Sequence, residues 1–283
     1  GPQAILSVFV VAGFSFQGTE LIGITAGEAE DPDKSVPKAI NQVFWRILLF
    51  YILAIFVISA LVYYKDPRLL SSSTQNIAVS PFTIVFKNAG IAFAASLMNA
   101  VILTSIVSSA NSGSYASTRM LYAMARKGDA PKIFAKLSTR GVPVAALVLT
   151  TAIGLLAFIA NTKGGSVAYT WLVNAFGLTG FIAWVGIAIS HYRFRRAYVA
   201  QGKSLSDLKY KAKWFPFGPL FALMISIGVI IGQDPDSFAH LNWEKIFVTY
   251  LSVPLFVILY FWYKVSHKTK LIALKDVDLK QYK

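Results

Sequence analysis

The sequence contains no cysteine among its 283 residues, which excludes disulfides, thiolate metal sites and a thiol nucleophile from this chain. Charged residues are also scarce, at 14%, against about 25% in soluble domains. The chain has no HExxH pair, no glycine-rich nucleotide loop and no nucleophile elbow, and its three histidines are scattered along the sequence. We therefore expect neither an enzyme nor a metal or cofactor site.

Apolar residues dominate what is present. They make up 55% of the chain, and the mean hydropathy is +0.57, which together predict an all-α protein with several membrane spans. Apolar windows long enough to cross a membrane define a membrane domain over residues 1–264, followed by a basic tail over 265–283. The predicted spans are 4–27, 40–63, 81–110, 143–161, 169–191, 216–232 and 246–263.

Basic residues are divided unequally between the two sides of these predicted spans. Five of the 27 fall on one side, namely Lys65, Arg68, Lys87, Lys163 and Lys245, and the other 22 fall in the alternate loops and the tail. Because short cytoplasmic loops retain Lys and Arg, we expect the C-terminus in the cytoplasm and the first residue outside, in a plasma-membrane protein. This sorting also accounts for the net charge of +14 through topology and contact with the lipid bilayer, and it argues against nucleic-acid binding.

The first predicted span is interrupted by the polar stretch FSFQGTE, which begins at Phe14. Each apolar half is too short to cross alone, and irregular backbone at membrane depth persists only inside protein or along a wet cavity. Gly18 weakens the helix at this point, and Thr19 is placed to cap a second helix that starts at Glu20. We therefore predict a broken helix, the arrangement that marks a substrate site near the midplane of many transporters.

Such a break offers main-chain carbonyls from its first half to an ammonium group and main-chain N–H groups from its second half to a carboxylate. Glu20 is the main candidate residue, because an acid at the centre of a span costs about 2.5–3.5 kcal/mol to insert. It either contributes to a substrate or proton site or caps the second half-helix as a buried acid. Glu28 belongs to an acidic run near the cytoplasmic end of the span, which fits a solvated interface or a gate.

Three long motifs, FSFQGTELIGITAGEAEDP, SSANSGSYASTRMLYAMA and YTWLVNAFGLTGFIAWVGIAISHYRFRRA, resemble the amino-acid transporter family of the amino acid–polyamine–organocation superfamily. The resemblance covers nearly the whole chain. It implies twelve spans in a leucine-transporter-like fold, of which this chain would be the C-terminal seven, starting with the broken sixth helix. The first five spans, with the half-site that holds the substrate carboxylate, would then be missing from the chain as given.

The resemblance also assigns roles to residues of the break. It implies that carbonyls around Phe14, Ser15 and Gln17 hold the substrate amino group, that Phe14 is an aromatic gate, and that Glu20 is tied to proton coupling or substrate binding. With the local pattern, this predicts a substrate-binding set of Phe14, Ser15, Gln17, Gly18, Thr19 and Glu20, and a proton-coupling or gating pair of Glu20 and Glu28.

We expect a secondary active permease that imports lysine or another basic amino acid with protons by alternating access. A neutral or aromatic amino-acid permease of the same family is one alternative, which competition in uptake would separate. A transporter-like amino-acid sensor is the other, and it would show binding without flux.

Overall fold

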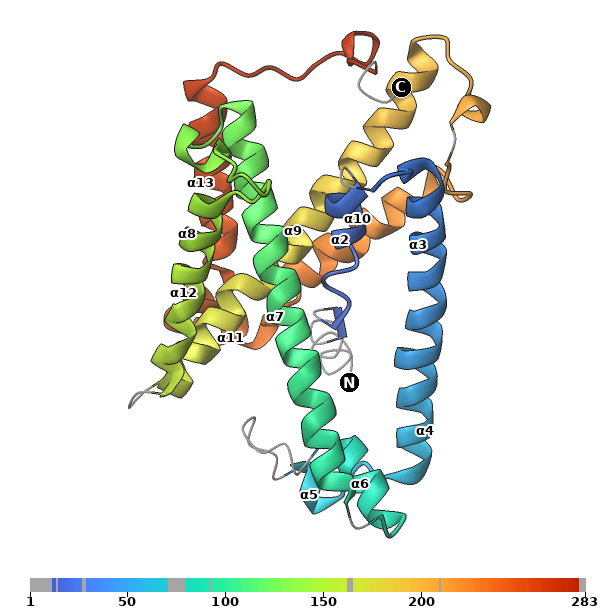
Figure 1. Cartoon of the computed structure of the whole chain (residues 1–283), viewed down its shortest axis with the longest axis vertical. Helices are drawn as coiled ribbons and strands as arrows, with labels where there is room; N and C mark the ends of the chain where they lie inside the picture. Colours follow the sequence, from blue (N-terminus) through green and yellow to red (C-terminus); the bar gives the residue numbers. More distant parts are fainter. Residues whose placement is uncertain are drawn as a thin grey trace. The chain divides into compact units, whose positions relative to one another are not determined.

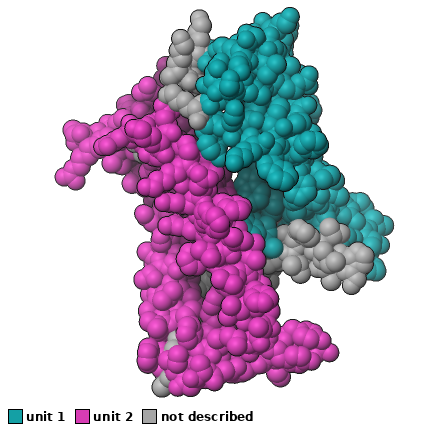
Figure 2. All heavy atoms as spheres, turned by 90° about the vertical axis from the view of Figure 1, so that its right-hand side faces the viewer, with its two compact units in different colours: residues 1–18, 156–283 teal, residues 19–155 magenta. Residues whose placement is uncertain are grey.

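A computed structural model of the chain describes residues 12–13, 15–26, 29–70, 80–91, 93–161, 165–208 and 210–279. Every regular element in these ranges is a helix, and none of the described residues forms a strand. The chain divides into two compact units: unit 1 comprises residues 1–18 and 156–283, and unit 2 comprises residues 19–155 (Figure 2).

Unit 2 contains a long apolar helix over Pro32–Leu61, which is π-helical over its middle seven residues. It is the one unbroken described helix that is both long and apolar enough to cross a membrane. Asp31 begins it by accepting a hydrogen bond from the main-chain N–H of Lys34. The elements of unit 2 are α2 (Leu21–Thr25), α3 (Pro32–Arg46), η2 (Ile47–Leu53), α4 (Ala54–Leu61), α5 (Pro67–Leu70), α6 (Pro81–Asn88), α7 (Ala94–Lys127), η4 (Lys132–Ala135) and α8 (Val144–Gly154), labelled in part in Figure 1.

The 34-residue helix α7 is the longest element of unit 2, and α2, α6 and α8 all contact it. It ends where Gly128 adopts a positive φ of 90°, the left-handed conformation that commonly terminates helices. Thr118 of α7 is buried and donates a 3.4 Å hydrogen bond to the hydroxyl of Thr150 in α8. Small residues and hydroxyl groups thus allow close helix packing in this unit.

Unit 1 is organised around the 36-residue helix α9, which packs along α10 and also contacts α12 and α13 (Figure 1). At 1.5 Å per residue α9 is about 54 Å long, well beyond the roughly 30 Å of a hydrocarbon layer. Helix α9 covers Gly165–Ala200, and the 3-10 helix η5 (Leu155–Asn161) comes before it in the chain. The remaining elements of unit 1 are η6 (Leu205–Asp207), α10 (Phe217–Ile231), α11 (Pro235–Ala239), α12 (Trp243–Tyr250), α13 (Ser252–Ser266) and η7 (Leu274–Asp276).

A small apolar core holds α9 and α10 together. Leu178, Phe181 and Val229 are its buried members, and Trp184 packs against them with its ring 5.3 Å from that of Phe181 in an edge-to-face arrangement. Edge-to-face aromatic pairs add about 0.5–1.5 kcal/mol beyond the area that they bury. The core therefore fixes the middle of α9, which is the part that faces the polar break described below.

The C-terminal end of α9 holds the following loop and the tail of the chain through main-chain carbonyls. Arg195, only 5% exposed, donates to the carbonyl of Ala212 at 3.0 Å and lies over the ring of Phe215. Arg193 donates to the carbonyl of Ile272 at 2.6 Å. Gln201 donates to the carbonyls of Leu274 and Val277, so part of the basic tail is packed on the helix.

A second polar cluster surrounds Asp234, in the turn between α10 and α12. The Asp234 carboxylate accepts a 2.7 Å hydrogen bond from the Ser237 hydroxyl and forms a 3.0 Å ion pair with Lys245. The Tyr250 hydroxyl donates to the carbonyl of Ile231 and accepts from the main-chain N–H of Asp234. Burial raises the pKa of Asp234, but the hydrogen bonds from Ser237 and Lys245 outweigh it, so the pKa lies below its ordinary value.

Candidate functional site

The polar break predicted from the sequence is a turn over residues 16–20, between the helical residues before it and the short helix α2. The piece before it includes Gly13, whose carbonyl accepts a 3.1 Å hydrogen bond from the main-chain N–H of Phe16. Gly18 has a φ of 101°, a left-handed conformation that any side chain would make costly. The chain thus breaks at the glycine that the sequence analysis singled out.

The second piece starts one residue later than the sequence suggested. Helix α2 begins at Leu21, and the residue at its cap position is Glu20 instead of Thr19. Glu20 is partly buried and its carboxylate makes no capping hydrogen bond to α2. The alternative in which Glu20 serves only to cap this helix therefore finds no support in the geometry.

Gln17 is the residue of the break with a well-defined partner at long range. Its side-chain amide donates a 2.8 Å hydrogen bond to the main-chain carbonyl of Gly177 in α9. The next glycine along that helix, Gly180, lies so close to the Gln17 amide that an added Cβ atom would overlap it. Sequence reasoning placed Gln17 in the site through its main chain and missed this contact, although two glycines in the motif FGLTG were a visible signal.

A second close approach brings the end of the first helical piece onto α9. A Cβ atom added at Gly13 would lie 2.5 Å from the ring of Phe181, which is itself buried in the core with Leu178. No side chain larger than hydrogen fits at Gly13 without moving this ring. The segment before the break is thus fitted to one face of α9 at two levels.

The other predicted residues fall in different settings. Ser15 is exposed, whereas Gly18, Thr19 and Glu20 are partly buried. Phe14 and Glu28 lie outside the described residues, and nothing is said of them. By unit, Ser15, Gln17 and Gly18 belong to unit 1, and Thr19 and Glu20 belong to unit 2.

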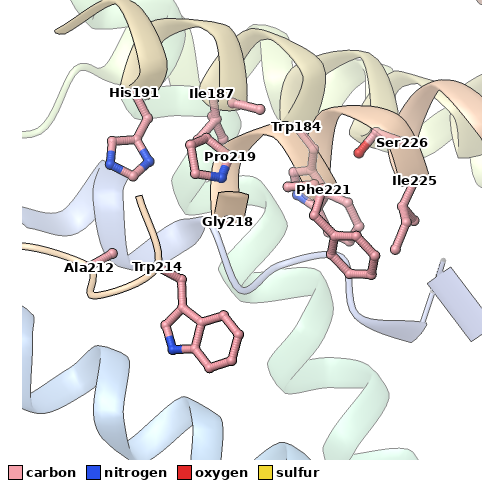
Figure 3. A pocket seen from close by; sticks show the side chains of 12 residues that line it. Trp184, Ile187, His191, Ala212, Trp214, Gly218, Pro219, Phe221, Ile225 and Ser226 are labelled. Carbon is pink, nitrogen blue, oxygen red and sulfur yellow. The ribbon is translucent and has the colours of Figure 1, made fainter. Parts of the chain in front are cut away.

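Unit 1 also contains an apolar cavity of about 520 Å³ between α9, α10 and the loop that joins them (Figure 3). Trp184, Ile187 and His191 line it from α9, Phe221 lines it from α10, and Trp214 lines it from the loop. The described residues that line the cavity come from α9, α10 and the loop between them, and they include none of Ser15, Gln17 and Gly18 of the same unit.

No group of three or more His, Cys, Asp or Glu side chains that would suit a metal ion is present among the described residues. The described part of the break offers main-chain carbonyls and N–H groups, the Gln17 amide, the hydroxyls of Ser15 and Thr19, and the carboxylate of Glu20. Such groups bind and orient a polar ligand, and the carboxylate can carry a proton.

The chain matches the family model for amino acid permeases over residues 2–275. It is 60% identical over 279 residues to the lysine-specific permease of Lactococcus lactis, and 51% identical over 283 residues to that of Escherichia coli, in both cases covering 99% of this chain. It is also 53% identical over its whole length to the histidine permease of Lactococcus lactis.

The chain spans 54% of the length of the Lactococcus lysine permease, 58% of the Escherichia coli lysine permease and 59% of the histidine permease. No solved structure matches it. The relatives are named as permeases, which are membrane transporters and not enzymes. With the family model matched over almost the entire sequence, this chain belongs to the amino acid permease family.

Proposed function

We propose that this chain is the C-terminal part of a secondary active permease that imports lysine or another basic amino acid together with protons. The observation that carries the proposal is the broken helix at Gly18, with the acid Glu20 directly after the break. An ionisable residue at membrane depth is by default part of a substrate or ion pathway.

The relatives support the choice of substrate. Two of them are named for lysine and one for histidine, at 51–60% identity. Lysine carries a cationic side chain in addition to its α-amino group, and the imidazole of histidine becomes cationic in mild acid; a cation moved out of water needs an acidic partner. We assign this role to Glu20, and the binding of the α-amino group to carbonyls near Phe14, Ser15 and Gln17.

The proposed architecture has seven spans in this chain, corresponding to the sixth to twelfth helices of a leucine-transporter-like fold, with the C-terminus in the cytoplasm. The apolar helix Pro32–Leu61 and the one-sided distribution of basic residues support it. Transport would follow alternating access around the break, with Glu20 and Glu28 as the candidates for proton coupling or gating.

The test is radiolabelled lysine uptake into proteoliposomes that contain the full-length permease to which we assign this chain, driven by an inward proton gradient. We expect Glu20→Gln to reduce uptake by about tenfold or more, because a loss of 1.4 kcal/mol in transition-state stabilisation already gives a factor of ten. Glu30→Gln is the matched control, since Glu30 is an exposed acid ten residues further on, and it should leave uptake unchanged.

Unlabelled lysine, histidine and neutral amino acids serve as competitors, and a protonophore tests the coupling. Wild-type uptake by the Glu20→Gln protein would contradict the role of Glu20. Competition by histidine alone would keep the permease and change the substrate. Binding of lysine without flux in the wild-type protein would favour a sensor.

A further inference from the structure

The polar break is held by a contact that neither its own sequence nor the names of its relatives indicate. The Gln17 amide donates to the carbonyl of Gly177, which is 160 residues away in the sequence, at 2.8 Å. This hydrogen bond holds the side chain of the residue next to Gly18 at a fixed point on α9.

The fit around this hydrogen bond depends on Gly180. A Cβ atom there would overlap the Gln17 amide group, whereas Cβ atoms at Gly177 and Gly186 of the same helix would meet nothing within 4 Å. Among these three glycines of α9, the close approach to the Gln17 amide is therefore specific to Gly180. A methyl group at Gly180 would force the Gln17 side chain out of its position.

The order of the two close approaches shows how the two segments are aligned. Gly13 meets Phe181, and Gln17, four residues later, meets the carbonyl of Gly177, four residues earlier. Gln17 therefore lies nearer the start of α9 than Gly13 does, so the two segments run antiparallel. Phe181 is 2% exposed and is braced by the apolar core, so this seat has little freedom to shift.

We propose that Gly180, together with the carbonyl of Gly177, forms a seat on α9 that sets the position of the polar break, and that Gln17 is a positioning residue. In this proposal, which rests on the function proposed above, the Gln17 amide does not bind the substrate. It holds the turn so that the main-chain carbonyls around it are oriented toward the substrate amino group. Misplacing such groups by about 1 Å costs as much as a hundredfold in rate.

The first experiment compares Gly180→Ala with Gly186→Ala in the full-length permease, by lysine uptake and by equilibrium lysine binding. We expect Gly180→Ala to raise the KM for lysine by about tenfold or more, on the scale set by small misplacements of binding groups. Gly186→Ala adds the same methyl group to the same helix outside the seat, where nothing lies within 4 Å, and should leave KM within about twofold of the wild-type value.

The second experiment is a double-mutant cycle with Gln17→Ala. This change removes the amide that the new methyl group would strike, so the double variant should bind lysine no worse than Gln17→Ala alone. Strongly non-additive effects are the signature of two residues that act through one contact. Additive losses in KM, or a Gly180→Ala protein that matches Gly186→Ala, would overturn the proposal.

The third measurement does not depend on transport. Because the chain has no cysteine, Gln17→Cys and Gly180→Cys can be introduced together and joined with a short thiol cross-linker, the product being identified by mass spectrometry of peptides. We expect a cross-link for this pair and none for Gln17→Cys with Gly186→Cys. If the wild-type protein transports no amino acid and the cross-link still forms, the proposed function fails while the seat on α9 stands; absence of the cross-link would refute the seat itself.

Discussion

The two polar clusters of unit 1 hold their loops with opposite chemistry. At the C-terminal end of α9 the side chains are donors, and Arg195 and Gln201 reach for main-chain carbonyls of segments far away in the sequence. In the turn after α10 the central side chain is an acceptor, and Asp234 collects a hydroxyl, a main-chain N–H and the ammonium group of Lys245 within eleven residues.

This difference has two consequences. Guanidinium and amide donors keep their protonation state at any ordinary pH, so acid does not remove the donors of the α9 cluster. The Asp234 cluster loses its acceptor when the carboxylate is protonated. The α9 cluster should matter more at neutral pH, however, because its arginine is almost fully buried at 5% exposure, and a buried group left without its partner costs more than an exposed one.

The largest expected effect is that of Arg195→Ala. The change removes the donor to the Ala212 carbonyl and the cation over the Phe215 ring, which together should lower the free energy of unfolding by about 2–4 kcal/mol. Thermal denaturation of the purified protein in detergent, followed by tryptophan fluorescence, measures the loss. Retention of the wild-type melting temperature would show that this contact adds nothing to stability.

Arg196→Ala is the matched control for that experiment. Arg196 is the next residue on the same helix, but it is exposed and lies 5.7 Å from the ring of Tyr192. Exposed cation–π contacts contribute about 0.5–1 kcal/mol, so the melting temperature should fall much less. Equal falls in the melting temperature of the two variants would mean that the loss of a positive charge, and not the loss of the buried contact, is responsible.

The next effect concerns acid and Asp234. Its pKa is lowered in the folded protein, so its contribution to stability is fully present above the unfolded-state value of about 3.9 and is lost as the pH falls through the lower folded-state pKa. We expect Asp234→Asn to destabilise the protein by about 1–2 kcal/mol at pH 7, and the difference from wild type to shrink below about pH 4.

Melting temperatures of both proteins between pH 3 and pH 7 test this, because other carboxylates titrate equally in the two and cancel in the difference. Asp236→Asn is the control: it lies two residues further on, in the first turn of α11. A difference between wild type and Asp234→Asn that stays constant down to pH 3 would contradict the assignment of acid sensitivity to Asp234.

The two clusters also differ in how far away their partners lie in the sequence, and this difference separates what the sequence could predict from what it could not. The break at Gly18 and the cap at Asp234 depend on residues that are close in sequence, and glycine in a polar interruption or Asp before Pro-x-Ser has a local physical meaning. The contacts of Gln17 with Gly177 and of Arg195 with Ala212 use main-chain carbonyls. Every residue has such a carbonyl, so residue type does not identify the acceptor, although glycines, as in FGLTG, signal that another segment can approach the helix closely.

Glu20 illustrates an intermediate case. Its place beside the break was predicted from its charge within an apolar segment, and its position at the start of a second helix was predicted to within one residue. What remained invisible was that Gln17, three residues earlier, turns its side chain to α9. Pattern reasoning finds residues that are unusual for their surroundings, and a glutamine in a polar turn is not unusual.

The smallest expected effect is that of Gln201→Ala on the tail. Gln201 donates to the carbonyls of Leu274 and Val277, and losing these bonds should favour local release of the tail by about 1 kcal/mol, close to a fivefold change in the open population. Leu279 is 6% exposed and becomes a chymotrypsin site on release, so cleavage after it should accelerate by the same factor. Lys213→Ala, an exposed change in the preceding loop, should leave the rate as in wild type. Equal cleavage rates for Gln201→Ala and wild type would mean that other contacts of the tail, such as the one from Arg193 to the carbonyl of Ile272, are sufficient, and that donors at the end of α9 act redundantly where the acceptor Asp234 does not.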